Sequence, residues 1–475
     1  MNSKSKQRKN QVAIVNIFEQ QEIIRKAEEV KAGLKASTWH ELETKGKFTK
    51  NDKLTFIKDD MLILGCDIGS EIHYLRAIDT RGRELSRSAL PFNNNLEGFE
   101  MALNWAVKLA AVYNKSQIVM GLEPTGHYWF AVATWMIAHG ISVVQVNPYA
   151  VKQTKEIEDN SQKKDDRKDP KLIANLVKDG NYGLPYLPEG LYSDIRRLSM
   201  FRDQLTEDRI RCMNRLHREM RIYFPEYKEA FGRVEGIFCL SVLKEAPFPE
   251  DLTALGSKGL QDIWHQAKLR GRGYSRAGEI VRLAKNSIGL KEGVEAGKEA
   301  VKWFVDLILR IEEKLESINK QIEQKCAEIP HAEKLLEISG LGKNTLSGIL
   351  AEMGDLERFD DVKEIQKLSG LSLVSCDSGK HKGETRISYR GRKRLRYWLF
   401  QAAKSVVAHA PEFQELHMYY TSRADNPLKK IQSLIVIACK LLRIIFAIMK
   451  NGMDYDPKKM LKDIHREEKR QVQAA

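Results

Sequence analysis

The chain has 475 residues, more than one hydrophobic core usually serves, so we expect two or three domains. Its 42% hydrophobic and 30% charged residues exclude a protein embedded mainly in a membrane. The formal net charge of +14 favours a polyanionic partner, commonly nucleic acid, although proteins that bind none reach a similar excess. Six cysteines without a CxxC pair indicate neither a disulfide framework nor a zinc site.

Residues 1–60 are predicted to be a charged N-terminal extension, with a helical stretch over residues 17–34 and a polar run after it. Charges interrupt its apolar positions every few residues, so it contains no signal-peptide core and we expect a cytoplasmic protein. The most apolar stretch of the chain is residues 431–449. Because Gln432, Lys440 and Arg443 interrupt it, the pattern predicts a buried helix and no membrane partner.

From residue 61 the sequence changes to short apolar runs that are typical of strands. The segments MLILGCDIG, IHYLRAID and ELSRSAL predict three antiparallel strands. A helical pattern over 96–113, the run QIVMGLE, a helix over 128–139, the strand SVVQVN and further helix from about residue 148 follow. This is the element order of the RNase H fold, an α/β fold with a mixed sheet and flanking helices, and we assign it to residues 61–187.

Acidic residues fall at the ends of these predicted elements. Asp67 closes the first strand and Glu123 the fourth, and those strands are neighbours in an RNase H-like sheet. Asp166 and Asp169 are three residues apart, so they share one face of the last predicted helix. Oxygen ligands suit Mg²⁺ or Mn²⁺, and two such ions about 4 Å apart can promote phosphodiester displacement.

Each of these acids also has an ordinary structural explanation. A single Asp at the end of a strand is more often a turn or cap residue than a metal ligand. Asp169 directly precedes Pro170, a pattern that is typical of a helix N-terminus. The joint placement of the acids on three elements of one predicted fold favours the metal site.

The remaining sequence predicts an all-α part. Apolar residues at helical spacing predict long helices from about residue 192 to 227 and from 302 to 329, which could pair as an antiparallel coiled coil. We assign residues 188–330 to this helical region, residues 331–455 to a helical C-terminal domain, and residues 456–475 to a charged tail.

The segment LLEISGLGKNTLSGILAEMG in the C-terminal domain resembles a helix-hairpin-helix element. It predicts a helix, a glycine loop, and a second helix capped near Asn344 or Thr345. Gly340 and Gly342 would let backbone N–H groups turn toward a phosphate, and Lys343 would add charge. The same loop type also occurs as a plain connector between helices.

A dense run of cations follows, with Tyr389 and Tyr397 among them. Cations at this density suit phosphate contacts, and aromatic rings can stack on exposed bases. Leu395, Trp398 and Leu399 share a helical face and are expected in the core. The expected nucleic-acid contacts are Gly340, Gly342, Lys343, Lys380, Arg386, Arg390, Arg392, Lys393 and Arg394.

The motifs GCDIG, GLEPTGHYW and DRKD resemble those of the DEDD-type transposases of bacterial insertion sequences, a group that includes the Piv-type DNA invertases. The resemblance is weak over the first 60 residues and the middle helices. It implies a RuvC-like branch of the RNase H fold, and its four metal-binding acids correspond to Asp67, Glu123, Asp166 and Asp169.

One departure from the family pattern leaves the third acid open. Family members commonly have Thr-Asp followed two residues later by Asp-Ala, whereas here Asp165 precedes Asp166 and Pro170 follows Asp169. Since Asp165 also lies one helical turn from Asp169, it is an alternative to Asp166 as the third ligand.

The segment from Gly370 to Ala403 resembles the second signature of the family. In that family a serine, Ser378 by position here, is proposed to be the nucleophile that links covalently to the cut DNA end. A serine hydroxyl needs a base or a metal for activation, and a Ser-Gly pair is otherwise an ordinary turn. The resemblance further implies a structured guide RNA as a partner, and we expect a homo-oligomer, a dimer or tetramer.

Three functions therefore compete. The first is a transposase that cuts and rejoins DNA by metal-dependent, serine-assisted strand exchange. The second is a RuvC-like structure-specific endonuclease that hydrolyses DNA without the serine. The third is a nucleic-acid-binding protein without catalytic activity, against which the presence of all four acids argues.

Overall fold

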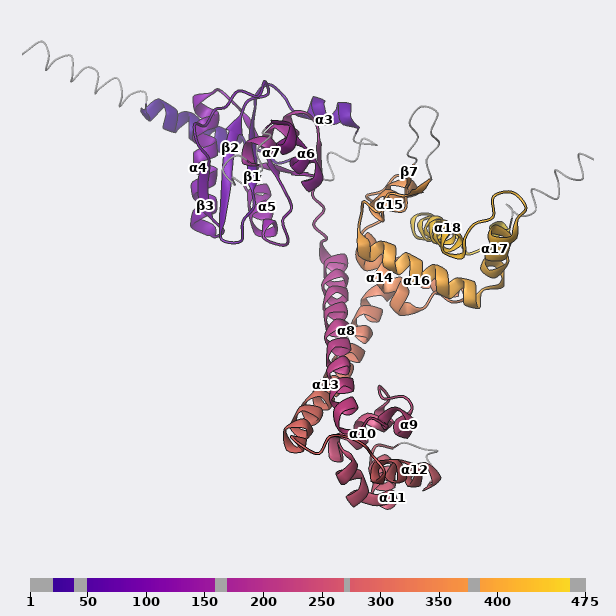
Figure 1. Ribbon diagram of the computed structural model, residues 1–475. Helices are drawn as coiled ribbons and strands as arrows, with labels where there is room; N and C mark the ends of the chain where they lie inside the picture. Colours follow the sequence, from indigo (N-terminus) through magenta and orange to yellow (C-terminus); the bar gives the residue numbers. More distant parts are fainter. Residues whose placement is uncertain (1–19, 38–48, 159–168, 269–273, 375–384, 462–475) are drawn as a thin grey trace, which may run out of the picture. The chain divides into compact units, whose positions relative to one another are not determined.

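The computed structural model describes residues 20–37, 49–158, 169–268, 274–374 and 385–461. The chain divides into two compact units, Met1–Leu187 and Pro188–Ala475, which are described separately below (Figure 1). The finer domain boundaries at residues 60, 330 and 455 remain predictions.

A mixed six-stranded sheet forms the centre of unit 1, in the order β3-β2-β1-β4-β5-β6. Strand β1 is antiparallel to β2 and parallel to β4, β4 is parallel to β5, and β2 is antiparallel to β3. The strands are β1 Met61–Asp67, β2 Ile72–Ile78, β3 Leu90–Asn93, β4 Gln117–Leu122, β5 Ser142–Val146 and β6 Tyr182–Gly183. The mixed sheet with flanking helices is consistent with the predicted RNase H-like fold.

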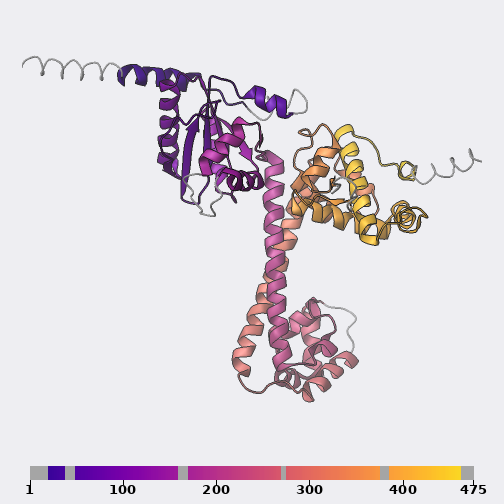
Figure 2. The same ribbon diagram turned by 45° about the horizontal axis from the view of Figure 1, so that its top comes forward.

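Helices cover both faces of the sheet (Figures 1 and 2). On one face, α4 and α5 pack against even-numbered β1 residues such as Leu62 and Leu64. On the other face, α7 packs against odd-numbered residues such as Ile63. Because side chains alternate along a strand, the even-numbered residues of β1 face α4 and α5, and the odd-numbered residues face α7. The helices are α4 Leu96–Val112, α5 Trp129–Ala138, α6 Pro148–Glu158 and α7 Asp169–Lys178.

The third strand begins later than predicted, at Leu90, and the prediction of a strand over ELSRSAL is wrong. Glu84 forms only an isolated bridge with Ile78, and the Ser86 hydroxyl accepts a hydrogen bond from the Ala77 amide. The Ala77 amide therefore bonds to a side-chain oxygen, where a paired strand would offer a backbone carbonyl. The short strand β6, which pairs with the edge of β5, is an addition that the sequence pattern did not indicate.

The described part of the N-terminal extension belongs to unit 1 and packs against its sheet and helices. Ala27, Val30 and Leu34 contact the core on the α4 and α5 side. Helix α3, Lys50–Phe56, contacts the start of β6, where Lys53 Nζ donates to the carbonyl of Tyr182 over 2.6 Å. These residues therefore add to the core of unit 1.

His73 on β2 is fully buried beside the rings of Phe92 and Phe99. Burial lowers the pKa of His73, and the nearby Asn94 side chain opposes this only in part. As pH falls through about 6.5, the unfolded chain takes up a proton that the folded chain resists. We therefore expect the free energy of unfolding to decrease as the pH is lowered below about 6.5, by up to about 1.4 kcal/mol per pH unit.

Urea unfolding between pH 7.5 and 5.5 checks this prediction. In His73→Phe the free energy of unfolding should depend less on pH, because the contribution of His73 is lost. Substitution of the exposed His409 should leave the pH dependence unchanged. Equal pH profiles for His73→Phe and the unsubstituted chain would refute it.

Two long antiparallel helices run through unit 2: α8 Gly190–Tyr223 and α13 Val294–Ala327. Lys325 pairs with Asp194 near one end, at 2.7 Å, and Arg209 pairs with Glu312 further along, at 2.9 Å. The helices between them build a separate apolar core around Phe224, Phe248 and Trp264, in a region whose sequence was not informative. They are α9 Tyr227–Phe231, α10 Ile237–Glu245, α11 Pro249–Gln266 and α12 Tyr274–Lys285.

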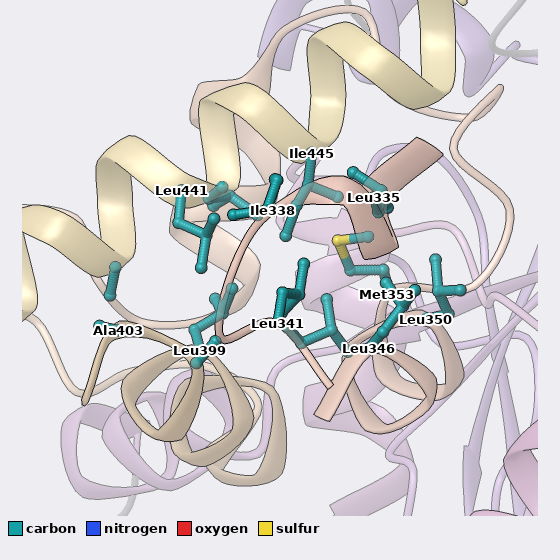
Figure 3. Packing of buried hydrophobic residues seen from close by; sticks show 14 of the residues in the cluster. Leu335, Ile338, Leu341, Leu346, Leu350, Met353, Leu399, Ala403, Leu441 and Ile445 are labelled. Carbon is teal, nitrogen blue, oxygen red and sulfur yellow. The ribbon is translucent and has the colours of Figure 1, made fainter. Parts of the chain in front are cut away.

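The C-terminal part of unit 2 is helical, as predicted. Its core gathers leucines and isoleucines from α14, α16, α18 and the short helix η1, and Figure 3 shows Leu346, Leu399 and Leu441 among them. The elements are η1 Glu333–Glu337, α14 Lys343–Met353, α15 Val362–Leu368, β7 Leu373–Val374, β8 Arg386–Ile387, α16 Lys393–His409, α17 Pro411–Ser422, α18 Lys430–Asn451 and α19 Pro457–Met460.

Helix α18 is long and apolar enough to cross a membrane, with a mean hydropathy of 2.2 over its most apolar window. It instead places Ile437, Leu441 and Ile445 in the core, each fully buried. Since 39% of that window is buried, the prediction of a buried helix is confirmed for one face of α18.

Candidate active site

Asp67 and Glu123 lie at the carboxyl ends of two neighbouring parallel strands. The register of β1 and β4 pairs Gly65 with Gly121 and Cys66 with Leu122, and the next residues along the two chains are Asp67 and Glu123. Both acids have odd numbers, and the odd-numbered residues of β1 and β4 face α7. Both residues therefore lie at the same edge of the sheet, and alternation along the strands would put their side chains on the same face.

Two glycines let α7 approach this face closely. A Cβ on Gly65 would lie 1.8 Å from the carbonyl oxygen of Pro170, and a Cβ on Gly121 would lie 2.3 Å from a methyl carbon of Val177. The glycines are paired across β1 and β4, and each stands two residues before one of the acids. Helix α7 thus begins beside Gly65, and its first residue, Asp169, is brought toward the two strand ends.

Electrostatics link the third acid to the second. Burial raises the pKa of Glu123, and the negative charge of Asp169 raises it further, whereas Lys155 lowers it. Lys155 on α6 donates to both carboxylate oxygens of Asp169, over 2.7 and 3.0 Å. Glu123, Asp169 and Lys155 therefore form one electrostatic group beside the end of β4.

Among the residues that the structure describes, no three Asp, Glu, His or Cys side chains lie close enough together to hold a metal ion. The predicted third ligand, Asp166, and its alternative, Asp165, lie in residues 159–168, outside the described residues. The described acids still fit a hard cation by their chemistry, because they are carboxylates and because Asp169 already binds an ammonium group.

The structure assigns specific packing roles to the glycine loop of unit 2. Gly340 has a φ of +88°, and a Cβ there would lie 2.6 Å from the carbonyl oxygen of Ser405. Helix α14 begins at Lys343 with Gly342 as its N-cap, so the predicted cap at Asn344 or Thr345 is wrong. Lys343 pairs with Glu323 at 3.0 Å, and the five-residue 3-10 helix η1 stands before the loop, where the sequence predicted the first helix of the hairpin.

Part of the predicted basic stretch makes internal contacts. Arg392 donates to the carbonyl of Glu352 near the end of α14, and Arg394 pairs with Asp203 on α8. Arg386, Arg390 and Lys393 are exposed. Ser378 and Lys380 lie in residues 375–384, outside the described residues.

Leu395 and Leu399 on α16 are fully buried, which confirms the prediction that these two leucines belong to the core. Trp398 is partly buried, with its ring against Gly348 and the Arg202 guanidinium, whose central carbon lies 5.0 Å from the ring centroid.

Sequence reasoning missed Lys155 and the glycine pair. A signal for the glycines was present, since Gly-x-Asp at Gly65 and Gly-x-Glu at Gly121 repeat one spacing on two predicted strands. Lys155 gave no comparable signal, because a lysine on an exposed-looking helix is ordinary.

A mixed sheet of this strand order, with carboxylates at the ends of its two central parallel strands, is consistent with the RNase H-like class of nucleic-acid enzymes. Two family models match the chain: one described as a transposase over residues 64–225, and one described as the transposase IS116/IS110/IS902 family over residues 332–418. The chain belongs to this family of insertion-element transposases, and it is a DNA transposase or recombinase.

Relatives agree with this assignment. The chain is 23% identical over 405 residues to a 44.8 kDa protein of insertion element IS116 of Streptomyces clavuligerus, a match that covers 84% of this chain and 97% of the relative. It is 28% identical over 254 residues to the pilin gene-inverting protein of Moraxella bovis, covering 50% of this chain and 75% of that protein. It is also 18% identical over 411 residues to a 43.6 kDa protein of IS110 of Streptomyces coelicolor, covering 84% and 96%.

Proposed function

We propose that the chain cuts and rejoins DNA at the ends of its insertion element by divalent-metal-dependent, serine-assisted strand exchange, on a RuvC-like domain. The observation that supports this most is the register of β1 and β4, which pairs Cys66 with Leu122, the residues directly before Asp67 and Glu123. The electrostatic link between Glu123 and Asp169, the first residue of α7, adds to it. In this proposal three carboxylates from three elements would meet at one sheet edge when the metal is bound.

Asp67, Glu123 and Asp169 would hold the metal, with Asp166 or Asp165 as the fourth acid. Mg²⁺ or Mn²⁺, two ions in this proposal, would supply positive charge at the phosphate and at the leaving oxygen. The chain's own contribution is placement. The glycine pair fixes α7 against the strands, and Lys155 holds the Asp169 carboxylate while offsetting its repulsion of Glu123.

Ser378 would act as the nucleophile. The serine hydroxyl gives up its proton as its oxygen attacks the scissile phosphorus and a serine–phosphate bond forms. The bond from phosphorus to the leaving sugar oxygen breaks, and that oxygen takes up a proton to become a free hydroxyl. The number of phosphodiester bonds is conserved, so a second sugar hydroxyl can reverse the exchange and join new strands. A hydrolytic nuclease would instead use water and leave free ends.

The proposed partners are the element ends, the target DNA and a structured guide RNA, bound by a homo-oligomer in the cytoplasm. Exposed cations on α8, Arg215 and Arg221 among them, suit an RNA that is recognised by shape and backbone. The exposed Arg386, Arg390 and Lys393 suit contacts with phosphates.

Replacing Ser378 tests the proposal against the hydrolytic alternative. In Ser378→Ala we expect strand joining and the covalent protein–DNA adduct to fall below detection, because no other group would form the phosphoserine bond. The measurement uses end-labelled DNA that carries the element ends and resolves the adduct on denaturing gels.

The control is Ser372→Ala, a nearby serine that should leave both readouts unchanged. If Ser378→Ala still cleaves at the full rate, the chain is a hydrolytic nuclease and the serine role is refuted. If acid substitutions at Asp67 and Glu123 also change nothing, the non-catalytic hypothesis holds.

A further inference from the structure

A pocket of about 590 Å³ lies in unit 2, and the proposed chemistry does not use it. Four helices supply its lining, α8, α13, α14 and α16, so residues far apart in the sequence meet there. Its size falls within the range of about 300–1,000 Å³ that is usual for small-molecule sites. The residues that matter most for its chemistry are Arg202, Asn319, Asn344, Lys393, Arg394 and Tyr397.

An aromatic ring in the lining is held in place yet remains accessible. Tyr397 is 53% exposed, and its ring packs edge-on against Trp398 with centroids 5.2 Å apart. Trp398 is itself fixed, because a Cβ on Gly348 would lie 2.4 Å from its ring and Arg202 covers it. A rigid, accessible ring of this kind is a surface on which a nucleobase can stack.

Amide groups line the same pocket. The Asn319 side-chain oxygen is buried and has no hydrogen-bond partner among the described residues, and Asn344 is exposed on the first turn of α14. A buried polar atom without a partner is unfavourable, so a ligand that offers one is favoured. Asn side chains can donate and accept at once, which matches the edge of a base.

Cations outnumber anions in the pocket's lining, where Asp203 and Glu207 oppose three basic residues. Arg202 is 5% exposed, and its hydrogen bonds go to the hydroxyls of Ser347 and Ser199, over 3.1 and 3.3 Å. Burial lowers the pKa of Arg394, and the positive charge of Arg202 lowers it further, while the Asp203 carboxylate lies beside both guanidinium groups. Lys393 is exposed at the start of α16. Because Asp203 already offsets the charge of that pair, Lys393 is the exposed cation of the lining with which a phosphate can pair.

We propose that this pocket binds a single unpaired nucleotide that is displaced from the nucleic acid. The base stacks on Tyr397, the Asn319 and Asn344 amides bind its edge, and the phosphate pairs with Lys393. The nucleotide comes from the DNA or from an RNA partner, since both carry the same base and phosphate chemistry. The inference rests on the proposed function only in taking nucleic acid as the substrate.

The test uses the full chain and single-stranded oligonucleotides that carry one 2-aminopurine, in a DNA series and an RNA series. We expect quenching of the fluorescent base on binding, as stacking on Tyr397 requires. Tyr397→Leu should bind about tenfold more weakly and lose the quenching, whereas Tyr397→Phe should retain both. Asn319→Leu, which removes the amide, should weaken binding by a similar factor.

Two exposed residues outside the pocket serve as controls: Lys404 on the same helix as Lys393, and Trp303, which is 64% exposed on α13. Lys404→Ala and Trp303→Ala should bind and quench as the unsubstituted chain does. The series with the stronger quenching identifies DNA or RNA as the source of the nucleotide.

The pocket proposal fails if Tyr397→Leu binds and quenches like Tyr397→Phe, or if neither oligonucleotide series is quenched by the unsubstituted chain. Asp67→Asn separates this failure from failure of the proposed function. It should lose strand joining and keep the quenching, because Asp67 is not part of the pocket. Normal strand joining in a chain that quenches neither series would refute the pocket alone.

Discussion

Asp67→Asn is expected to lower the rate of strand joining by about a thousandfold while leaving the fold intact. Asn has the shape of Asp but lacks its charge, and the loss corresponds to about 4 kcal/mol of transition-state stabilisation, an ordinary magnitude for a metal-dependent site. Asp67 ends a buried strand beside Glu123, so its charge acts where the metal would lie. Glu123→Gln should have an effect of similar size.

The rate is measured with purified protein and DNA that carries the element ends, in the presence of Mg²⁺. Glu156→Gln is the matched control, because Glu156 is an exposed acid next to Lys155 on α6 and belongs to no predicted site. It should retain the full rate, and far-ultraviolet circular dichroism should be the same for all variants. A rate within threefold of normal for Asp67→Asn would mean that this carboxylate takes no part in the reaction.

Gly65→Ala is expected to destabilise unit 1 by about 3 kcal/mol and to reduce strand joining strongly. The added Cβ would lie 1.8 Å from the Pro170 carbonyl oxygen and 2.6 Å from the Ala174 nitrogen. Both are backbone atoms in a helix, so the helix must move as a body, and overpacking of this severity is costly. Since α7 carries Asp169, its displacement would also disperse the carboxylates.

Urea unfolding and the strand-joining rate measure the two effects of Gly65→Ala. Gly183→Ala is the control, because Gly183 also lies on a strand of the same sheet and a Cβ there meets nothing within 4 Å. It should change neither quantity by much. If Gly65→Ala unfolds at the same urea concentration as the unsubstituted chain, the close approach of α7 to β1 is not part of the native packing.

The order of elements in unit 1 could be predicted because its strands are short apolar runs separated by turns. Asp67 and Glu123 could be placed at strand ends for the same reason, and their adjacency followed from the expected strand order. The shift of the third strand to Leu90 could not be predicted from the apolar pattern, and before it the Ala77 amide donates to the Ser86 hydroxyl instead of to a backbone carbonyl. A propensity pattern contains no information about such a contact.

The basic residues of the C-terminal part show a different limit of prediction from sequence. A run of arginines predicts phosphate contacts, but it does not tell which guanidinium groups meet a carbonyl or a carboxylate within the same unit. Arg392 and Arg394 do so, with Glu352 and Asp203. Those partners lie about 40 residues or more away along the chain, so only the packing of α14 against α16 and α8 identifies them.

The most direct measurement of the metal-site proposal is the binding of Mn²⁺ by the full chain, followed by the electron paramagnetic resonance signal of the free ion. We predict binding by the unsubstituted chain and by Glu156→Gln, and a loss of at least tenfold in affinity for Asp67→Asn and Glu123→Gln. Equal Mn²⁺ binding by all four proteins would contradict the proposal that Asp67 and Glu123 hold the metal.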